Sequence, residues 1–139
     1  PAHWALGPAI CRSRFRTSRC SNTVVRVTLE RIAAVSGGEN KRLMLRVEGH
    51  SGFGASGNDV VCAGISAITQ TALVAITKVA GIRQDLDHGE GFLESRIELD
   101  GLDESRRNSL NVIIDTMLAG LEEIEKENPG SLSISIRRT

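Results

Sequence analysis

The chain has 139 residues, of which 40% are hydrophobic and 24% are charged, and this composition is typical of one globular domain with a modest core. Seventeen basic and seventeen acidic residues cancel, so no net field draws the protein to nucleic acid or to a membrane surface. Aromatic residues make up only 3% of the chain, and no apolar run approaches the length of a membrane span. We therefore expect a soluble protein that does not bind nucleic acid or membranes directly.

Residues 1–23 differ in composition from the rest of the chain. They hold four arginines and no acidic residue. An arginine- and serine-rich start without acids is typical of organelle transit segments, but it lacks the apolar core of a secretory signal. Because the chain does not begin with methionine, we favour a non-native upstream extension, with translation starting near Val24 or Val25. We expect residues 1–23 to be poorly ordered and residues 24–139 to form a single domain.

The cysteines show no spacing typical of a metal site. Cys11 and Cys20 make neither a C-x-x-C pair nor, with His3, a zinc-binding pattern. The odd total of three cysteines, in a chain without an export signal, fits a reducing cytoplasm in which Cys62 stays a free thiol. We therefore expect a cytoplasmic protein without a metal.

Two segments near the start of the domain alternate between apolar and polar residues. Val25, Val27 and Leu29 alternate with polar side chains, and the same period of two recurs between Leu43 and Val47. This period indicates half-buried strands, and the intervening residues 36–40 have the composition of a turn. The pattern predicts an N-terminal β-hairpin.

A glycine-rich loop then leads into an apolar helix that we predict from Asn58 to about Ala80. Asn58 is a good N-cap and places Cys62 at the end of the first turn, where free N–H groups and the helix dipole favour a thiolate. If the loop folds back, His50 could form an imidazolium–thiolate pair with Cys62, which would make the sulfur a nucleophile. Asp59 and Ser66 lie three before and four after Cys62, on the same helix face.

Spacing alone leaves other interpretations of this stretch open. A single cysteine in an apolar helix is commonly a small core residue, and a histidine before a glycine-rich loop is commonly a turn residue. Asp59 could orient His50, but its carboxylate could also oppose thiolate formation at Cys62. These residue types therefore indicate a candidate nucleophile and base without establishing catalysis.

The glycines of the loop also match a second motif. Gly52, Gly54 and Gly57 spell G-x-G-x-x-G between a predicted strand and a predicted helix, the context of a dinucleotide-binding turn. The acidic residue expected about twenty positions later is missing, because residues 75–79 contain no Asp or Glu. No Gly-Lys-Ser/Thr follows either, as a phosphate-binding P-loop requires. We instead expect these glycines to permit loop movement and close approach of a substrate.

The second half of the chain predicts two strands, a helix and a last strand. Segments 82–86 and 92–99 flank a predicted turn that contains His88, our second candidate for a histidine near the site. Apolar residues then recur at helical spacing over 103–127, and residues 132–136 alternate as a final strand. We interpret Arg137 and Arg138 as an exposed basic tail.

These elements follow the order ββαββαβ. The order predicts an α+β fold, a two-layer sandwich in which two helices pack on one face of a largely antiparallel sheet. The open edges of the sheet could be satisfied by pairing two chains.

The residues around Cys62 resemble the ribosomal-processing cysteine protease family. The similarity lies in Gly49-His50, in the glycine-rich spacer and in the run Asp59-Val60-Val61-Cys62-Ala63-Gly64 followed by Ser66-Ala67. It extends more weakly from about Val24 to the end of the chain. The resemblance implies a bacterial cytoplasmic cysteine endopeptidase that removes the N-terminal extension of large-subunit ribosomal protein twenty-seven by cutting after an aromatic residue.

The same resemblance implies roles for individual residues. Cys62 matches the nucleophile and His50 the general base and acid, and Asp59 and Ser66 match supporting positions. In the loop, Gly52, Phe53, Gly54 and Gly57 are expected to contact the substrate. The resemblance implies a homodimer and requires no cofactor or metal. The alternatives are a ribosome-associated binding module without catalysis and a nucleotide-binding domain that uses the glycine loop.

Overall fold

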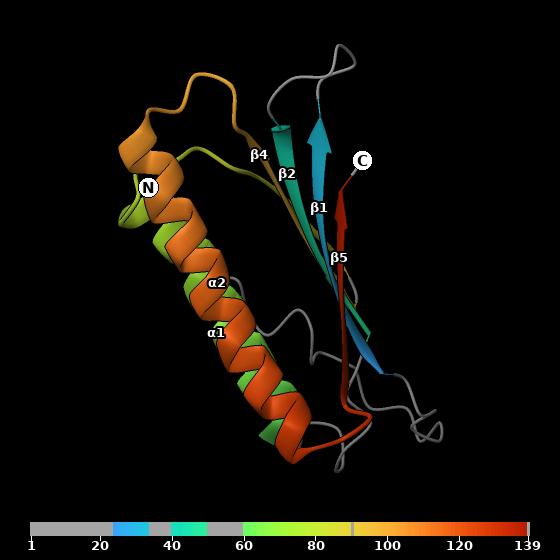
Figure 1. Cartoon of the computed structure of the whole chain (residues 1–139). Coiled ribbons are helices and arrows are strands. Elements are labelled where there is room, and N and C mark those ends of the chain that lie inside the picture. Colours follow the sequence, from blue (N-terminus) through green and yellow to red (C-terminus); the bar gives the residue numbers. More distant parts are fainter. Residues whose placement is uncertain (1–23, 34–39, 50–59, 90, 139) are drawn as a thin grey trace.

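The structure is a computed structural model, and it describes residues 24–33, 40–49, 60–89 and 91–138. Its elements in chain order are β1 (Val25–Ala33), β2 (Asn40–Glu48), α1 (Val60–Lys78), β3 (Asp85–Gly89), β4 (Phe92–Glu98), α2 (Glu104–Glu127) and β5 (Leu132–Arg138). The five strands form one sheet in the order β3-β4-β2-β1-β5. Both helices lie on one face of this sheet (Figure 1). The predicted ββαββαβ order and two-layer α+β fold are therefore confirmed.

Most neighbouring strands in the sheet are antiparallel. β2 pairs antiparallel with β1 and with β4, and β4 pairs antiparallel with β3. The exception is β5, which lies parallel to β1 with Leu132 beside Val25. Since β4 lies between β2 and β3 and is antiparallel to both, the strand–loop–helix unit around α1 does not connect two adjacent parallel strands. This topology argues against the dinucleotide-binding interpretation of the glycine loop.

The core fills the space between the helices and the sheet. The strands contribute one face of alternating apolar residues, and each helix contributes one stripe. The strand members include Val25, Val27, Leu29, Leu43, Leu45, Val47, Leu93 and Ile97, and the helix members include Ile65, Leu73, Ile76, Leu110, Ile114, Met117 and Leu121. The two helices approach closely where Gly120 of α2 faces Ile68 of α1, since a Cβ at Gly120 would lie 3.2 Å from the Ile68 Cδ1.

α1 is long and apolar enough to cross a membrane by length and composition, so the expectation that no apolar run approaches this length is wrong. The composition has another explanation in the fold. Its residues Ile65, Leu73 and Ile76 are fully buried in the core beneath the sheet. A helix that supplies much of the core of a small domain needs many apolar residues. The apolar composition of α1 is therefore not in itself evidence of a membrane span.

β3 begins three residues later than the sequence pattern predicts. Residues 82–84 belong to the connection from α1, and Gln84 ties this connection to the helix. Its side-chain amide donates hydrogen bonds to the Leu73 carbonyl oxygen at 2.5 Å and to the Thr77 hydroxyl at 2.8 Å, and it accepts one from the Ser95 hydroxyl at 2.8 Å. These contacts hold the connection against α1, and pairing with β4 starts only at Asp85.

Two sequence-based expectations are corrected by the extent of the strands. His88 lies within β3, opposite Leu93, and not in a turn. Arg137 and Arg138 extend β5 opposite Glu30 and Arg31 and do not form a separate tail. α2 begins one residue later than expected, because Asp103 is its N-cap and accepts a hydrogen bond from the Arg106 N–H at 2.8 Å.

Candidate active site

Two of the eight predicted site residues lie in the part of the chain that the structure describes. These are Cys62 and Ser66, which both lie on α1. The other six fall outside the described residues, namely His50, Gly52, Phe53, Gly54, Gly57 and Asp59. Their predicted roles stay predictions.

Cys62 is the third residue of α1 and is almost completely buried, with 1% of its surface exposed. The N–H groups of the first helical turn have no acceptor within the helix, and the helix dipole adds partial positive charge there. α1 carries no acidic residue in its first turn. The helix start therefore favours a thiolate at Cys62, whereas the burial of the sulfur among core residues acts in the opposite direction.

The sulfur of Cys62 is joined in a disulfide in this structure. The expectation that Cys62 stays a free thiol is therefore wrong for this structure. A nucleophilic thiolate requires this bond to be reduced first.

Ser66 lies one helical turn after Cys62 and is 5% exposed. Residues four apart on a helix lie on the same face, so Ser66 shares the buried face of α1 with the sulfur. Its position is compatible with the supporting role that the sequence resemblance implies.

The end of β2 places the backbone from which the His50 loop starts. Gly49 has a φ of 94°, a conformation that favours glycine, and its N–H donates to the Gly91 carbonyl oxygen at 2.9 Å. This bond joins the end of β2 to the connection between β3 and β4. His50 follows Gly49 directly in the sequence.

His88, the second candidate histidine, lies at the same end of the sheet. It pairs with Leu93, which pairs with Val47, so the three side chains stand on one face of the sheet. Val47 and Leu93 are buried under the helices, whereas His88 on the edge strand is exposed. His88 is thus on the helix-facing side, at the end where β2 leads into the loop.

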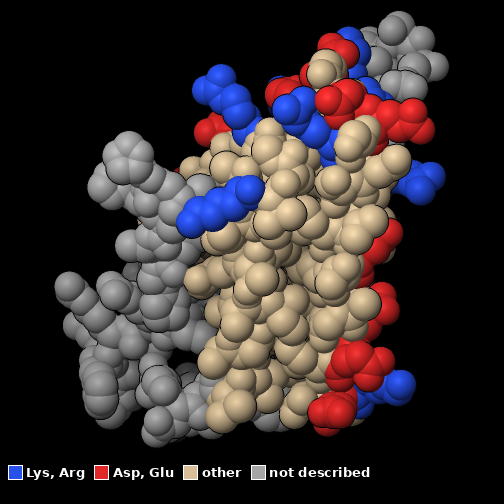
Figure 2. Space-filling view, turned by 90° about the vertical axis from the view of Figure 1, so that its left-hand side faces the viewer, with Lys and Arg blue, Asp and Glu red and all other residues tan. Residues whose placement is uncertain are grey.

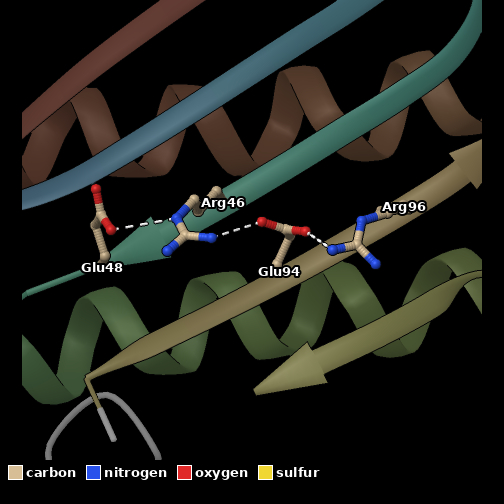
Figure 3. Close-up of polar contacts among 4 residues, drawn as sticks. All are labelled: Arg46, Glu48, Glu94 and Arg96. Atoms are coloured by element: carbon tan, nitrogen blue, oxygen red, sulfur yellow. Dashed lines mark hydrogen bonds and ion pairs between the residues drawn. The ribbon is translucent and has the colours of Figure 1, made fainter. Parts of the chain in front are cut away.

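A charged cluster on the opposite face of the sheet was missed by the sequence analysis. Arg46 of β2 donates to Glu94 of β4 at 2.7 Å and to Glu48 at 3.2 Å, and Arg96 also pairs with Glu94 (Figure 3). The Arg46 guanidinium also lies 5.2 Å from the centre of the Phe92 ring. The sequence does show Arg and Glu alternating with apolar residues in both strands, which could have indicated a charged outward face. Which Arg pairs with which Glu depends on the register between β2 and β4.

The ion pairs shift the pKa values of two members of this cluster. The hydrogen bond from Arg46 holds the pKa of Glu94 below its usual value, although burial acts in the opposite direction. The hydrogen bond to Glu94, followed by the one to Glu48, raises the pKa of Arg46. Glu94 is therefore a buried carboxylate that stays charged and joins β2 to β4 next to the start of the loop.

Replacing Glu94 with glutamine is expected to lower the free energy of unfolding by about 2 kcal/mol at neutral pH, because charge-assisted hydrogen bonds to two arginines are lost. A lowered folded-state pKa stabilises the fold above the usual carboxyl value of 4.5, and this stabilisation disappears as the pH falls through the folded-state pKa. Urea unfolding at pH 7 and at about pH 3 should therefore show the difference between wild type and variant shrinking in acid.

The matched control for this prediction is Glu98→Gln. Its carboxylate also pairs with an arginine, Arg42, at 2.7 Å, but its side chain is 62% exposed. Exposed ion pairs contribute less than about 1 kcal/mol, so this variant should stay close to wild type. Equal effects of the two substitutions would show that the Glu94 cluster has no special role in stability.

Comparison with known proteins decides the family. The model of the cysteine protease Prp family matches residues 31–133, which is most of the chain. The chain belongs to this family. A ribosomal processing cysteine protease Prp of Bacillus subtilis is 32% identical over 95 residues, which cover 67% of this chain and 84% of that protein. A protein of the same name from Staphylococcus aureus is 29% identical over 89 residues, 64% of this chain and 81% of that protein.

A solved structure shares the fold. It is the ribosomal processing protease Prp of S. aureus in complex with a covalently linked product peptide, with a TM-score of 0.59 and 24% identity. The match covers 79% of this chain and 98% of that chain. As a member of the Prp family the chain is a cysteine protease, and the alternative of a binding module without catalysis is set aside.

Proposed function

We propose that this protease removes the N-terminal extension of large-subunit ribosomal protein twenty-seven in the bacterial cytoplasm. The observation that carries the proposal is family membership. The relatives from B. subtilis and S. aureus are both named ribosomal processing proteases, and the matches span 84% and 81% of their lengths. The buried cysteine at the start of α1 supports the proposal, because it lies in the run of residues that carries the family resemblance.

In the proposed mechanism the Cys62 thiolate attacks the carbonyl carbon of the scissile peptide bond. The carbonyl oxygen becomes an oxyanion, which accepts hydrogen bonds from backbone N–H groups at the start of α1, such as those of Val61 or Cys62. His50 donates a proton to the leaving amine, the C–N bond breaks and a thioester remains on Cys62. His50 then removes a proton from water, whose attack releases the peptide acid and restores the thiol.

Asp59 and Ser66 have supporting roles in the proposed mechanism. Asp59 is proposed to orient His50, and Ser66 is proposed to contribute from the next turn of α1. A covalent intermediate is compatible with the fold relative, whose structure holds a covalently linked product peptide. No step of the proposed reaction requires a cofactor or a metal.

The identity of the substrate can be tested with synthetic peptides. A peptide that spans the start of the host's large-subunit ribosomal protein twenty-seven is incubated with reduced enzyme and analysed by mass spectrometry. We expect one cut after an aromatic residue. A peptide with this aromatic residue replaced by alanine should be cut at least about 10²-fold more slowly, because a filled specificity pocket is lost. Equal cleavage of both peptides would refute the proposed substrate.

We also propose that the active protein is a homodimer, as the sequence resemblance implies. Two features support this assembly. β3 and β5 are the edge strands of the sheet, and the outward face of the helix layer is largely uncharged in its middle (Figure 2). Val60 of α1 and Val112 of α2 are 82% and 64% exposed. Sedimentation equilibrium should give twice the mass of one chain, whereas a single-chain mass at micromolar concentration would exclude the dimer.

A further inference from the structure

A cavity of about 860 Å³ lies at the end of the sheet opposite to Gly49 and the start of α1. The start of β2, the end of β4, the connection from α1 to β3 and the first turn of α2 form its walls. Ile82 and Leu102 contribute apolar surface. The proposed reaction at Cys62 makes no use of this cavity.

Four arginines from four different segments line the cavity, namely Arg42, Arg83, Arg96 and Arg106. Two carboxylates line it as well, those of Asp85 and Glu98. The lining itself has four arginines and two carboxylates, and two further carboxylates, Glu94 and Asp103, pair with Arg96 and Arg106. In the space-filling view, Lys and Arg side chains gather together with Asp and Glu side chains at this end of the helix layer, where α1 ends and α2 begins (Figure 2).

Ion pairs hold three of the arginines in place. Arg42 pairs with Glu98 at 2.7 Å, Arg106 pairs with the N-cap Asp103 at 3.0 Å, and Arg96 pairs with the buried Glu94. A guanidinium has five N–H donors in a rigid fork, and contact with one carboxylate uses only one or two of them. The remaining donors stay available while the carboxylates restrict the orientation of each guanidinium.

Arg83 differs from the other three arginines. It is exposed, and it lies in the connection that Gln84 anchors to α1 and β4. Asp85, two residues further, is the nearest acid along the chain and begins β3. Arg83 thus brings an additional positive charge to a wall whose backbone is held by hydrogen bonds.

We propose that this cavity binds a phosphate group. Arginines from four segments line this cavity, and their guanidinium donors suit an oxyanion with three or more acceptor oxygens, such as phosphate, better than a single carboxylate. The volume lies within the range of small-molecule sites, so the ligand is a phosphorylated molecule of nucleotide size or a phosphate of an RNA strand. The site is separate from the protease chemistry and does not depend on the proposed substrate.

The test compares wild type with two variants in the full chain. Calorimetric titration with pyrophosphate at low ionic strength, with sodium chloride at matched ionic strength as the blank, should show binding to wild type. Arg83 makes no ion pair among the described residues, so Arg83→Gln is expected to weaken this binding about tenfold through the loss of one charge-assisted contact. Arg106→Gln tests the wall formed by α2 and should weaken binding to a similar extent.

The control is Arg26→Gln, an exposed arginine on β1 away from the cavity, which should bind pyrophosphate like wild type. Thermal unfolding without ligand verifies that each variant is folded. Fluorescence anisotropy with a short single-stranded RNA distinguishes the two sources of phosphate. Tighter binding of RNA than of pyrophosphate, weakened by Arg83→Gln, identifies an RNA site, and the reverse order identifies a small phosphorylated ligand. No binding of either probe, or equal weakening by Arg83→Gln and Arg26→Gln, would overturn the proposal.

Discussion

Cys62→Ala is expected to lower kcat/KM for the peptide substrate by at least about 10⁴-fold, because no other group in the proposed mechanism can form the acyl-enzyme. The residual rate should be that of the uncatalysed background. Cleavage followed by mass spectrometry measures the loss, and circular dichroism verifies that the variant is folded, since Cys62 is buried in the core. Substantial cleavage by the alanine variant would refute the assignment of the nucleophile.

The disulfide at Cys62 provides a control for this prediction. The other cysteines of the sequence are Cys11 and Cys20. A Cys11→Ser/Cys20→Ser double variant keeps the proposed nucleophile and cannot form a disulfide within the chain, so it should cleave the peptide without added reductant. Wild type with the disulfide of this structure should be inactive until dithiothreitol is added. Cleavage by fully oxidised wild type would contradict a role of the Cys62 thiolate.

His50→Ala is expected to lower kcat/KM by about 10²- to 10⁴-fold, the usual contribution of a general acid and base. The loss should include a change in the reactivity of Cys62 itself. An imidazolium next to the sulfur favours the thiolate, so wild type should react with an alkylating reagent at mildly acidic pH. In His50→Ala this reaction should shift toward the usual thiol pKa of about 8.5.

His88→Ala is the matched control for His50. His88 lies on β3 at the same end of the sheet but is exposed on the edge strand, so its removal should change kcat/KM by less than about threefold. Both variants should keep the wild-type unfolding temperature, which separates a catalytic loss from a structural one. If His88→Ala abolished cleavage and His50→Ala did not, the general base would be His88.

Local patterns in the sequence were sufficient for most of the elements. The alternation from Val25 to Leu29 depends only on the pleat of one strand, and the apolar spacing of α2 depends only on the helical repeat. The predicted start of α2 was wrong by one residue, because Asp103 is the N-cap and not the first helical residue. The candidate nucleophile was found because residue type, helix start and family resemblance all coincide at Cys62.

Other features depend on contacts between residues that are distant in the sequence. Segment 82–86 was predicted as a strand because it flanks a turn-like stretch, but hydrogen bonds from Gln84 to α1 and from Ser95 to Gln84 delay β3 until Asp85. Likewise, nothing near Cys62 in the sequence indicates that its sulfur is paired in a disulfide. Interactions of this kind override local preference because they are formed only when the layers pack.

The sequence alone predicted the order of elements, the two-layer fold class and the cysteine protease family. These three predictions depend on patterns among residues that are near one another in the chain. The strand order and register could only come from the assembled sheet, since many pairings are compatible with the same alternation. That register places Arg46 opposite Glu94, and the strand order brings Arg42 and Arg83 to one cavity. Both features arise from segments that meet only after the long-range contacts of the sheet have formed.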